Sequence, residues 1–307
     1  MIVDFQHHFT PNLKEPPRPR AIYANGIPIS TERPGLGRLE PHVKFMDKVG
    51  IDVSVLTSPR GMRGDVQLAA DANEGLVKAC REFPDRFRFL VHVAPFDSGS
   101  VREAKGWLSQ CPGAVLPSAF GEVGLDDQRL EGLYSLLEDE GKYLFIHAPV
   151  NATEGEAKAY NAYDLFRTVG REFSLVTALM RLVLGGVLDG HPKLKIVLSH
   201  FGGEVAPLVE RIEHYQDKSE WGLSEDPVHG KTSARPFRHY LGRVYFDTAG
   251  FYGNVGALKA ALLEIPKRRI VFGTDYPQEI REPEPAMRML SALRRIGAAQ
   301  NGSELLR

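Results

Sequence analysis

The sequence predicts an α/β fold: a single (β/α)8 barrel of the TIM type, with long loops after its first and fifth strands. Eight short apolar runs of strand-like composition recur along the chain, and segments with apolar residues at three-to-four spacing separate them. Alternating strands and helices indicate a parallel sheet. Eight such units in 307 residues suit a closed barrel better than an open sheet, so we expect one domain over residues 1–307.

Each expected strand is an apolar run that ends in polar residues. The eight runs are Ile2–Phe5, Val53–Thr57, Phe87–Ala94, Ala114–Pro117, Tyr143–Ile146, Lys195–Ser199, Val244–Asp247 and Ile270–Gly273. The amphipathic segments that we expect to form helices include Asp65–Phe83, Asp127–Gly141, Val205–Tyr215, Gly256–Leu263 and Pro285–Ile296.

Two long segments interrupt this alternation. Residues 12–38 follow the first run and are rich in Pro, Arg and Gly, and residues 151–174 follow the fifth run. In a (β/α)8 barrel, the loops that follow the strands lie on the carboxyl-terminal face, where active sites are built. We therefore expect both segments to contribute to a functional site.

The composition excludes some classes of partner. The formal net charge is −1, which gives no electrostatic reason to expect nucleic acid or an acidic membrane surface. Cys80 and Cys111 are too few to suggest a disulfide framework, and neither a signal peptide nor a membrane-spanning run is visible. We expect a cytoplasmic protein that acts on a small molecule, without a nucleic-acid or membrane partner.

The first strand ends in the polar stretch Gln6-His7-His8. Successive side chains of a strand point to opposite faces, so Gln6 and His8 share one face and His7 takes the other. A metal site on a strand needs two ligands two residues apart on one face. Here one of the two is a glutamine, which raises the question of whether the position still ligates a metal.

Polar residues also end the fifth, sixth and eighth expected strands. His147 follows the fifth, His200 the sixth and Asp275 the eighth. Strand ends meet at one mouth of a barrel, so these three residues and His8 would face a common pocket. Imidazole and carboxylate ligands suit a divalent cation, zinc first. A single histidine at a strand end is more often structural than a ligand, but four such ends are harder to explain that way.

At these residues the sequence resembles the amidohydrolase superfamily, specifically the branch of aminocarboxymuconate-semialdehyde decarboxylase and the related aromatic acid decarboxylases. The stretches that carry the resemblance span nearly the whole chain, in the family's order. They are Val-Asp-Phe-Gln-His-His-Phe at 3–9, Leu-Phe-Ile-His-Ala-Pro at 144–149, the run from Gly185 to Gly203 containing His-Pro-Lys-Leu-Lys-Ile-Val-Leu-Ser-His-Phe-Gly-Gly, Tyr-Phe-Asp-Thr-Ala at 245–249, and Phe-Gly-Thr-Asp-Tyr-Pro at 272–277.

The resemblance implies a barrel with one divalent metal, zinc first and manganese as the alternative. The ligands would fall on His8, His147 and Asp275, and the strand-six histidine that activates water or delivers a proton would fall on His200. Gln6 stands where the family usually has a histidine. Its carbonyl oxygen could still ligate, its place could be taken by water or substrate, or the substitution could mean that no metal binds.

The function that we expect is non-oxidative decarboxylation of a small aromatic or unsaturated carboxylic acid. Either His200 or Asp275 would act as the catalytic acid that protonates the carbon bearing the carboxylate. The alternative is hydrolysis of a lactone, amide or ester in the same pocket, or hydration of an unsaturated acid. A barrel that only binds a ligand is a third interpretation, because fold alone does not fix function.

Four further residues are candidates for substrate binding. Arg60 and Arg63 follow the second strand and could pair with a carboxylate, although each could equally be an exposed loop arginine. Phe201 and Tyr276 lie beside the expected ligands and could line a flat apolar pocket, with packing in the barrel core as the alternative. The family resemblance also implies a homodimer.

Overall fold

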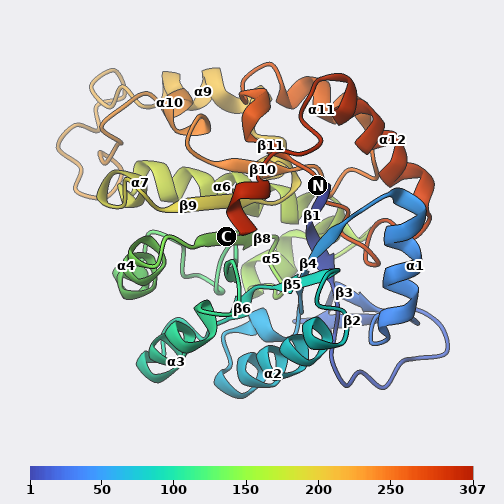
Figure 1. Ribbon diagram of the computed structural model, residues 1–307. Helices are drawn as coiled ribbons and strands as arrows, with labels where there is room; N and C mark the ends of the chain where they lie inside the picture. The colour runs from blue at the N-terminus through green and yellow to red at the C-terminus, as the bar shows by residue number, and fades with distance from the viewer. Residues whose placement is uncertain (307) are drawn as a thin grey trace.

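The computed structural model describes residues 1–306, and its centre is a ring of parallel strands (Figure 1). Every strand of the ring overlaps one of the runs expected from the sequence, and β1 continues three residues beyond its run, to His8. The predicted fold class is confirmed. The strands are β1 (Val3–His8), β4 (Val53–Thr57), β5 and β6 (Phe87–Phe89 and Val91–His92), β7 (Gly113–Pro117), β8 (Tyr143–His147), β9 (Lys195–Leu198), β10 (Tyr245–Asp247) and β11 (Ile270–Val271).

Two contacts close the ring. β5 pairs with β4 and β6 pairs with β7, and the two short strands are parts of one run interrupted at Leu90. β1 meets the segment after β11, where the amide of Asp275 donates to the carbonyl of Gln6 at 2.9 Å and the amide of His8 donates to the carbonyl of Tyr276 at 2.7 Å. The first and last strands are therefore neighbours, as barrel closure requires.

Helices surround the ring in chain order (Figure 1). The segments expected to be helical overlap α2, α4, α9, α11 and α12, and the structure adds further helices, the longest of which are α1, α3 and α6. No helix of residues 1–306 is both long and apolar enough to cross a bilayer. The bounds are α1 (Leu39–Val49), α2 (Val66–Glu82), α3 (Ser98–Leu108), α4 (Glu131–Asp139), α5 (Glu154–Ala159), α6 (Arg171–Leu184), α7 (Val187–Gly190), α9 (Val209–His214), α10 (Phe237–Leu241), α11 (Val255–Ala261) and α12 (Pro283–Arg295).

Strand alternation decides which side chains reach the barrel interior. In β8, Tyr143 and Phe145 belong to the inner cluster of the barrel, whereas Leu144 and Ile146 belong to the larger core between the ring and the helices. His147 has the same parity as Tyr143 and Phe145, so it faces the interior at the carboxyl end of the strand. Packing of its neighbours thus fixes the direction of the histidine.

The loop after β1 contains a hairpin that the sequence interpretation missed. β2 (Arg20–Ala24) and β3 (Ile27–Glu32) pair in antiparallel fashion around Asn25-Gly26, both of which have positive φ angles, 47° and 83°. Asn-Gly between apolar residues is a strong hairpin signal, because both residues tolerate this conformation. The Pro- and Arg-rich flanks of residues 12–38 obscured it.

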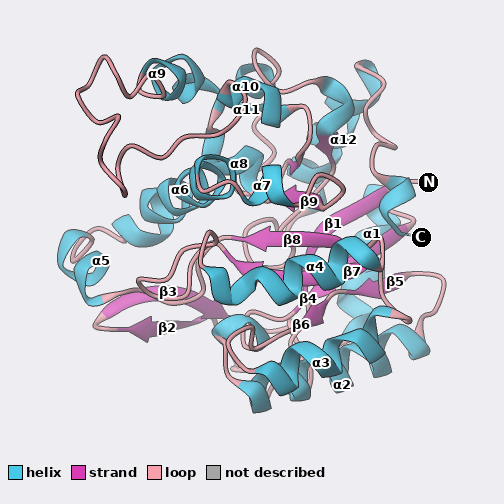
Figure 2. Cartoon of the chain, turned by 90° about the vertical axis from the view of Figure 1, so that its left-hand side faces the viewer, coloured by secondary structure: helices cyan, strands magenta, loops and turns pink. Residues whose placement is uncertain are grey.

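The hairpin lies over the mouth of the barrel. Figure 2 shows β8 and β9 pointing toward the side where β2, β3 and α5 lie. Ile27 and Ile29 of the hairpin pack with Ala152 and Phe166 from the loop after β8. The two long loops therefore support each other at the carboxyl end of the strands, on the face where both were expected.

Asp4 links the first strand to the segment after the last one, and its removal should weaken the fold. The fully buried carboxylate accepts from the amide of Thr274 at 2.9 Å and from its hydroxyl at 2.6 Å, and contacts Nδ1 of His7 at 2.9 Å. We expect Asp4→Ala to lower the free energy of unfolding by about 3 kcal/mol or more, because several buried polar groups lose their partner.

Urea unfolding at fixed metal concentration measures this effect. Asp47→Ala is the control, because Asp47 is 61% exposed and its ion pair with Arg86 should contribute less than about 1 kcal/mol. Equal stabilities of the two variants would mean that Asp4 does not hold the barrel closed.

Candidate metal and acid–base site

An irregularity in β1 sets the directions of Gln6, His7 and His8. Asp4 pairs with Ser54 and His7 with Leu56, so β1 advances three residues while β4 advances two. The extra residue is a β-bulge, a device that re-aims side chains near active sites. Gln6 and His8 face the groups inside the barrel mouth, and His7 turns away to contact Asp4 and His42, at 2.9 and 2.8 Å.

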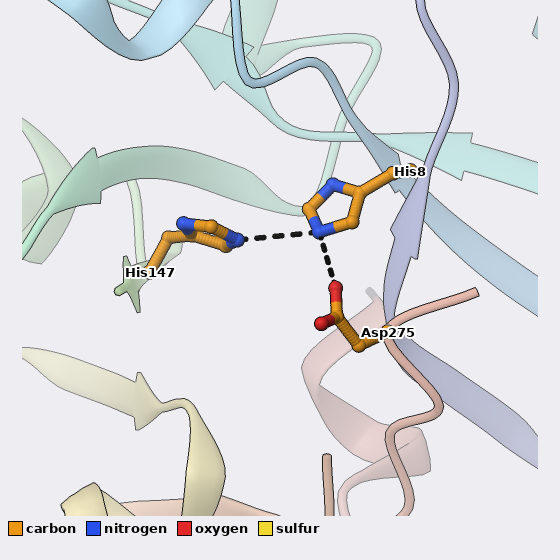
Figure 3. A group of neighbouring side chains, drawn as sticks. All are labelled: His8, His147 and Asp275. Atoms are coloured by element: carbon orange, nitrogen blue, oxygen red, sulfur yellow. Dashed lines mark hydrogen bonds and ion pairs between the residues drawn. The ribbon is translucent and has the colours of Figure 1, made fainter. Parts of the chain in front are cut away.

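Three side chains from distant strand ends converge at the mouth (Figure 3). Nε2 of His8, at the end of β1, lies 3.2 Å from Nε2 of His147, at the end of β8. Oδ1 of Asp275, just after β11, lies 2.6 Å from the same atom of His8. The three possible ligand atoms all lie within 4.8 Å of one another, and all three residues are buried.

The hydrogen bonds behind these ligand atoms orient them for a cation. Nδ1 of His147 lies 2.6 Å from the carbonyl oxygen of Ala148, which can only accept, so Nδ1 carries the proton and Nε2 keeps its lone pair. Nδ1 of His8 can donate in the same way to the hydroxyl of Thr57 at 3.0 Å. Two nitrogen lone pairs and a carboxylate then face one point inside the protein, which fits a divalent cation.

The protonation states of His147 and Asp275 are those that metal ligands require. Burial lowers the pKa of His147 well below its ordinary value, so the imidazole is neutral, the form that ligates metals. Burial alone would raise the pKa of Asp275, but the neighbouring His8 and His200 outweigh it and lower the pKa to about 2. Asp275 is therefore a carboxylate, the form suited to a ligand rather than to a proton donor.

His200 begins an unusual turn beside this group. The φ angles of residues 200–204, labelled α8 (His200–Glu204), all lie between 50° and 70°, so the turn is left-handed. A left-handed conformation costs roughly 1–2 kcal/mol for each residue other than glycine. The amide of His200 donates to buried Asp247 at 2.9 Å, which holds the start of the turn against β10.

Glu172, at the start of α6, controls the charge of His200. Its Oε1 lies 2.9 Å from Nδ1 of the His200 ring. Burial lowers the pKa of His200, but the carboxylates of Glu172, Asp275 and Asp247 together outweigh burial, with Glu172 the strongest of the three, and raise the pKa to about 10. The ring is therefore an imidazolium whose Nε2–H remains available on the other side. The sequence interpretation missed Glu172, because it lies in a long loop region and not at a strand end.

Gln6 contacts His200 through its side-chain amide. The amide nitrogen lies 3.3 Å from Nε2 of His200, and the carbonyl oxygen is buried without a partner among the described residues. An imidazolium has no acceptor to offer an amide N–H, and a half-turn of the amide would bring the carbonyl oxygen to the ring nitrogen instead. This contact favours Gln6 as an acceptor for His200 over Gln6 as a metal ligand.

The cavity above these residues includes both predicted arginines. Arg60 and Arg63 line the part next to His8 and His147. Arg60 is already paired with Glu32 at 2.5 Å, and Glu32 also pairs with Arg20. Arg63 has no ion pair with any residue between 1 and 306, so of the two it is the freer to meet an anionic substrate.

The two predicted aromatic residues lie elsewhere. Phe201 is fully buried and packs near Phe251, with ring centroids 5.9 Å apart. Tyr276 stacks on Phe45 at 4.0 Å, between the barrel and α1. Neither lines the cavities at the mouth. The alternative that the sequence left open, packing in the core, describes both residues, and we do not retain them as substrate-binding residues.

The fold and the site together define a barrel protein with a His-His-Asp group able to hold one divalent cation. The model of the amidohydrolase family matches residues 3–294, so the chain belongs to that family. The predicted branch is confirmed by curated relatives. Gamma-resorcylate decarboxylase of Rhizobium sp. (strain MTP-10005) is 25% identical over 78% of this chain and 77% of its own length. The 2-amino-3-carboxymuconate-6-semialdehyde decarboxylase of Dictyostelium discoideum is 24% identical over 80% and 69%.

A solved structure supports the fold. Dihydroxybenzoic acid decarboxylase from Polaromonas sp. JS666, with bound manganese and the inhibitor 2-nitroresorcinol, aligns with a TM-score of 0.77. The alignment covers 100% of this chain and 97% of the other at 22% identity. The arrangement of strands and helices is therefore shared across the whole barrel.

The His-His-Asp group leads to a prediction about metal affinity. We expect His147→Ala to weaken divalent-metal binding more than about 100-fold, since loss of an outer-shell partner alone costs about 10–100-fold. Equilibrium dialysis against zinc or manganese, with elemental analysis, measures the bound metal. His191→Ala is the control, because that buried histidine bonds to Glu131 and Glu138 and is not one of the proposed metal ligands. An unchanged metal content in His147→Ala would place the metal elsewhere.

The absence of a side chain at Gly250 leaves room for the His200 ring, and this leads to a prediction about kcat. A Cβ atom at Gly250, whose φ is 81°, would lie 2.2 Å from Cγ of His200. We expect Gly250→Ala to lower kcat at least tenfold by displacing the ring, while the metal content stays that of the wild type. Gly121→Ala is the control, because its φ is also positive, at 63°, but nothing lies within 4 Å of the added Cβ. Equal kcat values would show that the ring position is not restricted by Gly250.

Proposed function

We propose that this protein is a metal-dependent decarboxylase that removes carbon dioxide, without an oxidant, from a small aromatic or unsaturated carboxylic acid. The observation that carries the proposal is the position of His200, a buried imidazolium paired with Glu172, beside the His8–His147–Asp275 group. This arrangement sets a proton donor next to a site for a chelated carboxylate. The curated relatives of the chain are decarboxylases, which agrees with it.

We propose that one divalent metal is held by His8, His147 and Asp275. When bound, it supplies a Lewis acid that polarises and orients an oxygen-bearing substrate. The nitrogen-rich ligand set is typical of zinc, whereas the similar Polaromonas structure contains manganese. Loading the protein with each metal in turn and comparing activity decides between the two.

His200 would deliver the proton that the reaction needs. Nε2–H donates its proton to the ring carbon that carries the carboxylate, and the new C–H bond forms with an electron pair of the ring. The bond from that carbon to the carboxylate then breaks, its electron pair restores aromaticity, and carbon dioxide leaves. Solvent reprotonates His200. A positioned proton donor of this kind contributes about 10²–10⁴-fold to the rate.

The other polar residues would prepare His200 for this step. Glu172 bonds to Nδ1, so it keeps the ring charged and aims Nε2 at the substrate. Gln6 accepts from Nε2–H until the substrate carbon takes its place. Asp275, whose pKa is about 2, is poorly suited to the acid role that the sequence also allowed. Arg63 is proposed to attract the substrate carboxylate to the mouth.

Hydrolysis of a lactone, amide or ester is the alternative function in the same pocket. It requires a base that takes a proton from water near neutral pH. A histidine whose pKa is raised to about 10 is charged under those conditions and cannot accept another proton. The charge on His200 therefore favours proton donation, and with it decarboxylation, over hydrolysis.

The expected result for His200→Asn is a kcat about 10²–10⁴-fold lower, because the proton donor is lost. Carbon dioxide release from a panel of hydroxybenzoates measures it, with metal content determined in parallel. In deuterium oxide, the product should carry deuterium at the carbon that lost the carboxylate. His239→Asn is the control, since that residue lies on α10, on the outer layer of helices. Turnover of a lactone, with no carbon dioxide from any acid, would contradict the proposal.

A homodimer and a cytoplasmic location remain predictions from the sequence. Sedimentation of the purified protein over a range of concentrations tests the first, and the location of a tagged copy in cells tests the second.

A further inference from the structure

Two cavities meet beside the proposed acid and metal ligands. The smaller has a volume of about 50 Å³ and lies next to His8 and His147. The larger has a volume of about 520 Å³ and extends toward the hairpin, α6 and the segment after β11. We call the residues that line both cavities the neck. They are Ser30, Thr31, Arg171, His200, Asp275 and Gln278.

A substrate bound at the metal ligands must extend through the neck. Small-molecule sites usually have volumes of about 300–1,000 Å³, so the smaller cavity alone is too small for an aromatic or unsaturated acid. An acid whose carboxylate lies at the His8–His147–Asp275 group therefore reaches into the larger cavity. Because His200 and Asp275 are themselves neck residues, the atoms next to the reacting carbon would lie in the neck.

Most polar groups of the neck already have partners within the protein. The four bonds are those of Arg171 to the Ile29 carbonyl, His200 to Glu172, Asp275 to His8, and Arg167 to the Thr31 hydroxyl. In the larger cavity, arginines and carboxylates are equal in number, four of each. Recognition of a substituent in the neck is therefore left to neutral groups that are not yet bonded.

Gln278 and Ser30 are the two neck residues whose side chains remain available. Neither side chain makes a hydrogen bond with another group of residues 1–306, and both residues are half-buried. The backbone amides of Gln278 and Glu279 donate to the carbonyl of Asp275, at 2.8 and 2.9 Å. The turn that presents the proposed metal ligand thus also fixes the position of Gln278.

We propose that the side-chain amide of Gln278 binds a neutral hydroxyl substituent of the substrate, on the carbon next to the one that loses its carboxylate. Gln278 would then be a specificity-determining residue. An amide offers N–H donors and a carbonyl acceptor, and a hydroxyl both donates and accepts, so either orientation of the amide can form the bond. This inference rests on the proposed decarboxylase function and narrows its substrate class to hydroxy acids of this pattern.

The binding test uses the metal-loaded protein and two acids that differ in one substituent. The first is 2,6-dihydroxybenzoate. The second is 6-fluorosalicylate, in which fluorine, a poor hydrogen-bonding group, replaces one of the two hydroxyls. Each acid keeps a hydroxyl beside the carboxylate for the metal. Isothermal titration at low temperature and short times gives a Kd for each acid before turnover matters.

Two variants of Gln278 identify the bond. Gln278→Met keeps the length of the side chain and removes the amide. It should weaken 2,6-dihydroxybenzoate about two- to tenfold, the usual value of one neutral hydrogen bond, and leave the Kd of 6-fluorosalicylate unchanged. Gln278→Glu retains an acceptor for the hydroxyl but adds a negative charge. It should weaken both acids and still prefer the dihydroxy acid.

Gln67→Met is the matched control, because Gln67 is exposed on α2 and bonded to Asp71. It should change neither Kd. Metal content and thermal melting show whether each variant is folded. An equal effect of Gln278→Met on the two acids, or no effect on either, would overturn the inference. So would loss of the preference in Gln278→Glu.

Activity measurements separate this inference from the proposed function. If binding shows the expected dependence on Gln278 but neither acid releases carbon dioxide, the decarboxylase proposal fails and the hydroxyl contact stands. If both acids are decarboxylated and Gln278→Met changes kcat/KM by the same factor for both, the function stands and the hydroxyl contact fails.

Discussion

The closure of β1 onto the segment after β11 is the constraint on which the site depends. His8 ends the first strand and Asp275 follows the last one, so these residues are 267 positions apart in sequence and meet only because the ring closes there. The buried bonds of Asp4 to Thr274 and of Asp275 to the Gln6 carbonyl fix that closure. His147 then completes the group, because the parity of β8 directs it inward. The His8–His147–Asp275 group and the closed barrel are thus consequences of the same contacts.

The sequence predicted the parts of the molecule that depend on local pattern. Apolar runs identified the strands, and the polar residues at their ends identified His8, His147, His200 and Asp275, because strand ends of a barrel meet at one mouth. The alternation of side chains along a strand also predicted that His7 points away from the face shared by Gln6 and His8. The hairpin after β1 was missed although Asn25-Gly26 marks it, since its flanks contain proline and arginine in place of a clean alternation.

Residues that act through contacts between distant segments could not be read from pattern. Glu172 lies in the first turn of α6, in a segment that we expected to be a loop. It bonds to His200 only because the left-handed turn after β9 brings the ring to it. Phe201 and Tyr276 follow site residues in sequence, yet the backbone turns their rings into the core. Proximity in sequence is therefore a weak guide to which residues line the cavity.

We propose that the metal binds to His8, His147 and Asp275, and that Gln6 instead hydrogen-bonds with His200. Anomalous diffraction from crystals loaded with one metal tests this most directly. It should give one strong peak at the mouth, about 2.0–2.2 Å from Nε2 of His8, Nε2 of His147 and an oxygen of Asp275, with the Gln6 amide against His200. A peak bound to Gln6 and away from His147, or no peak at the mouth, would contradict the account.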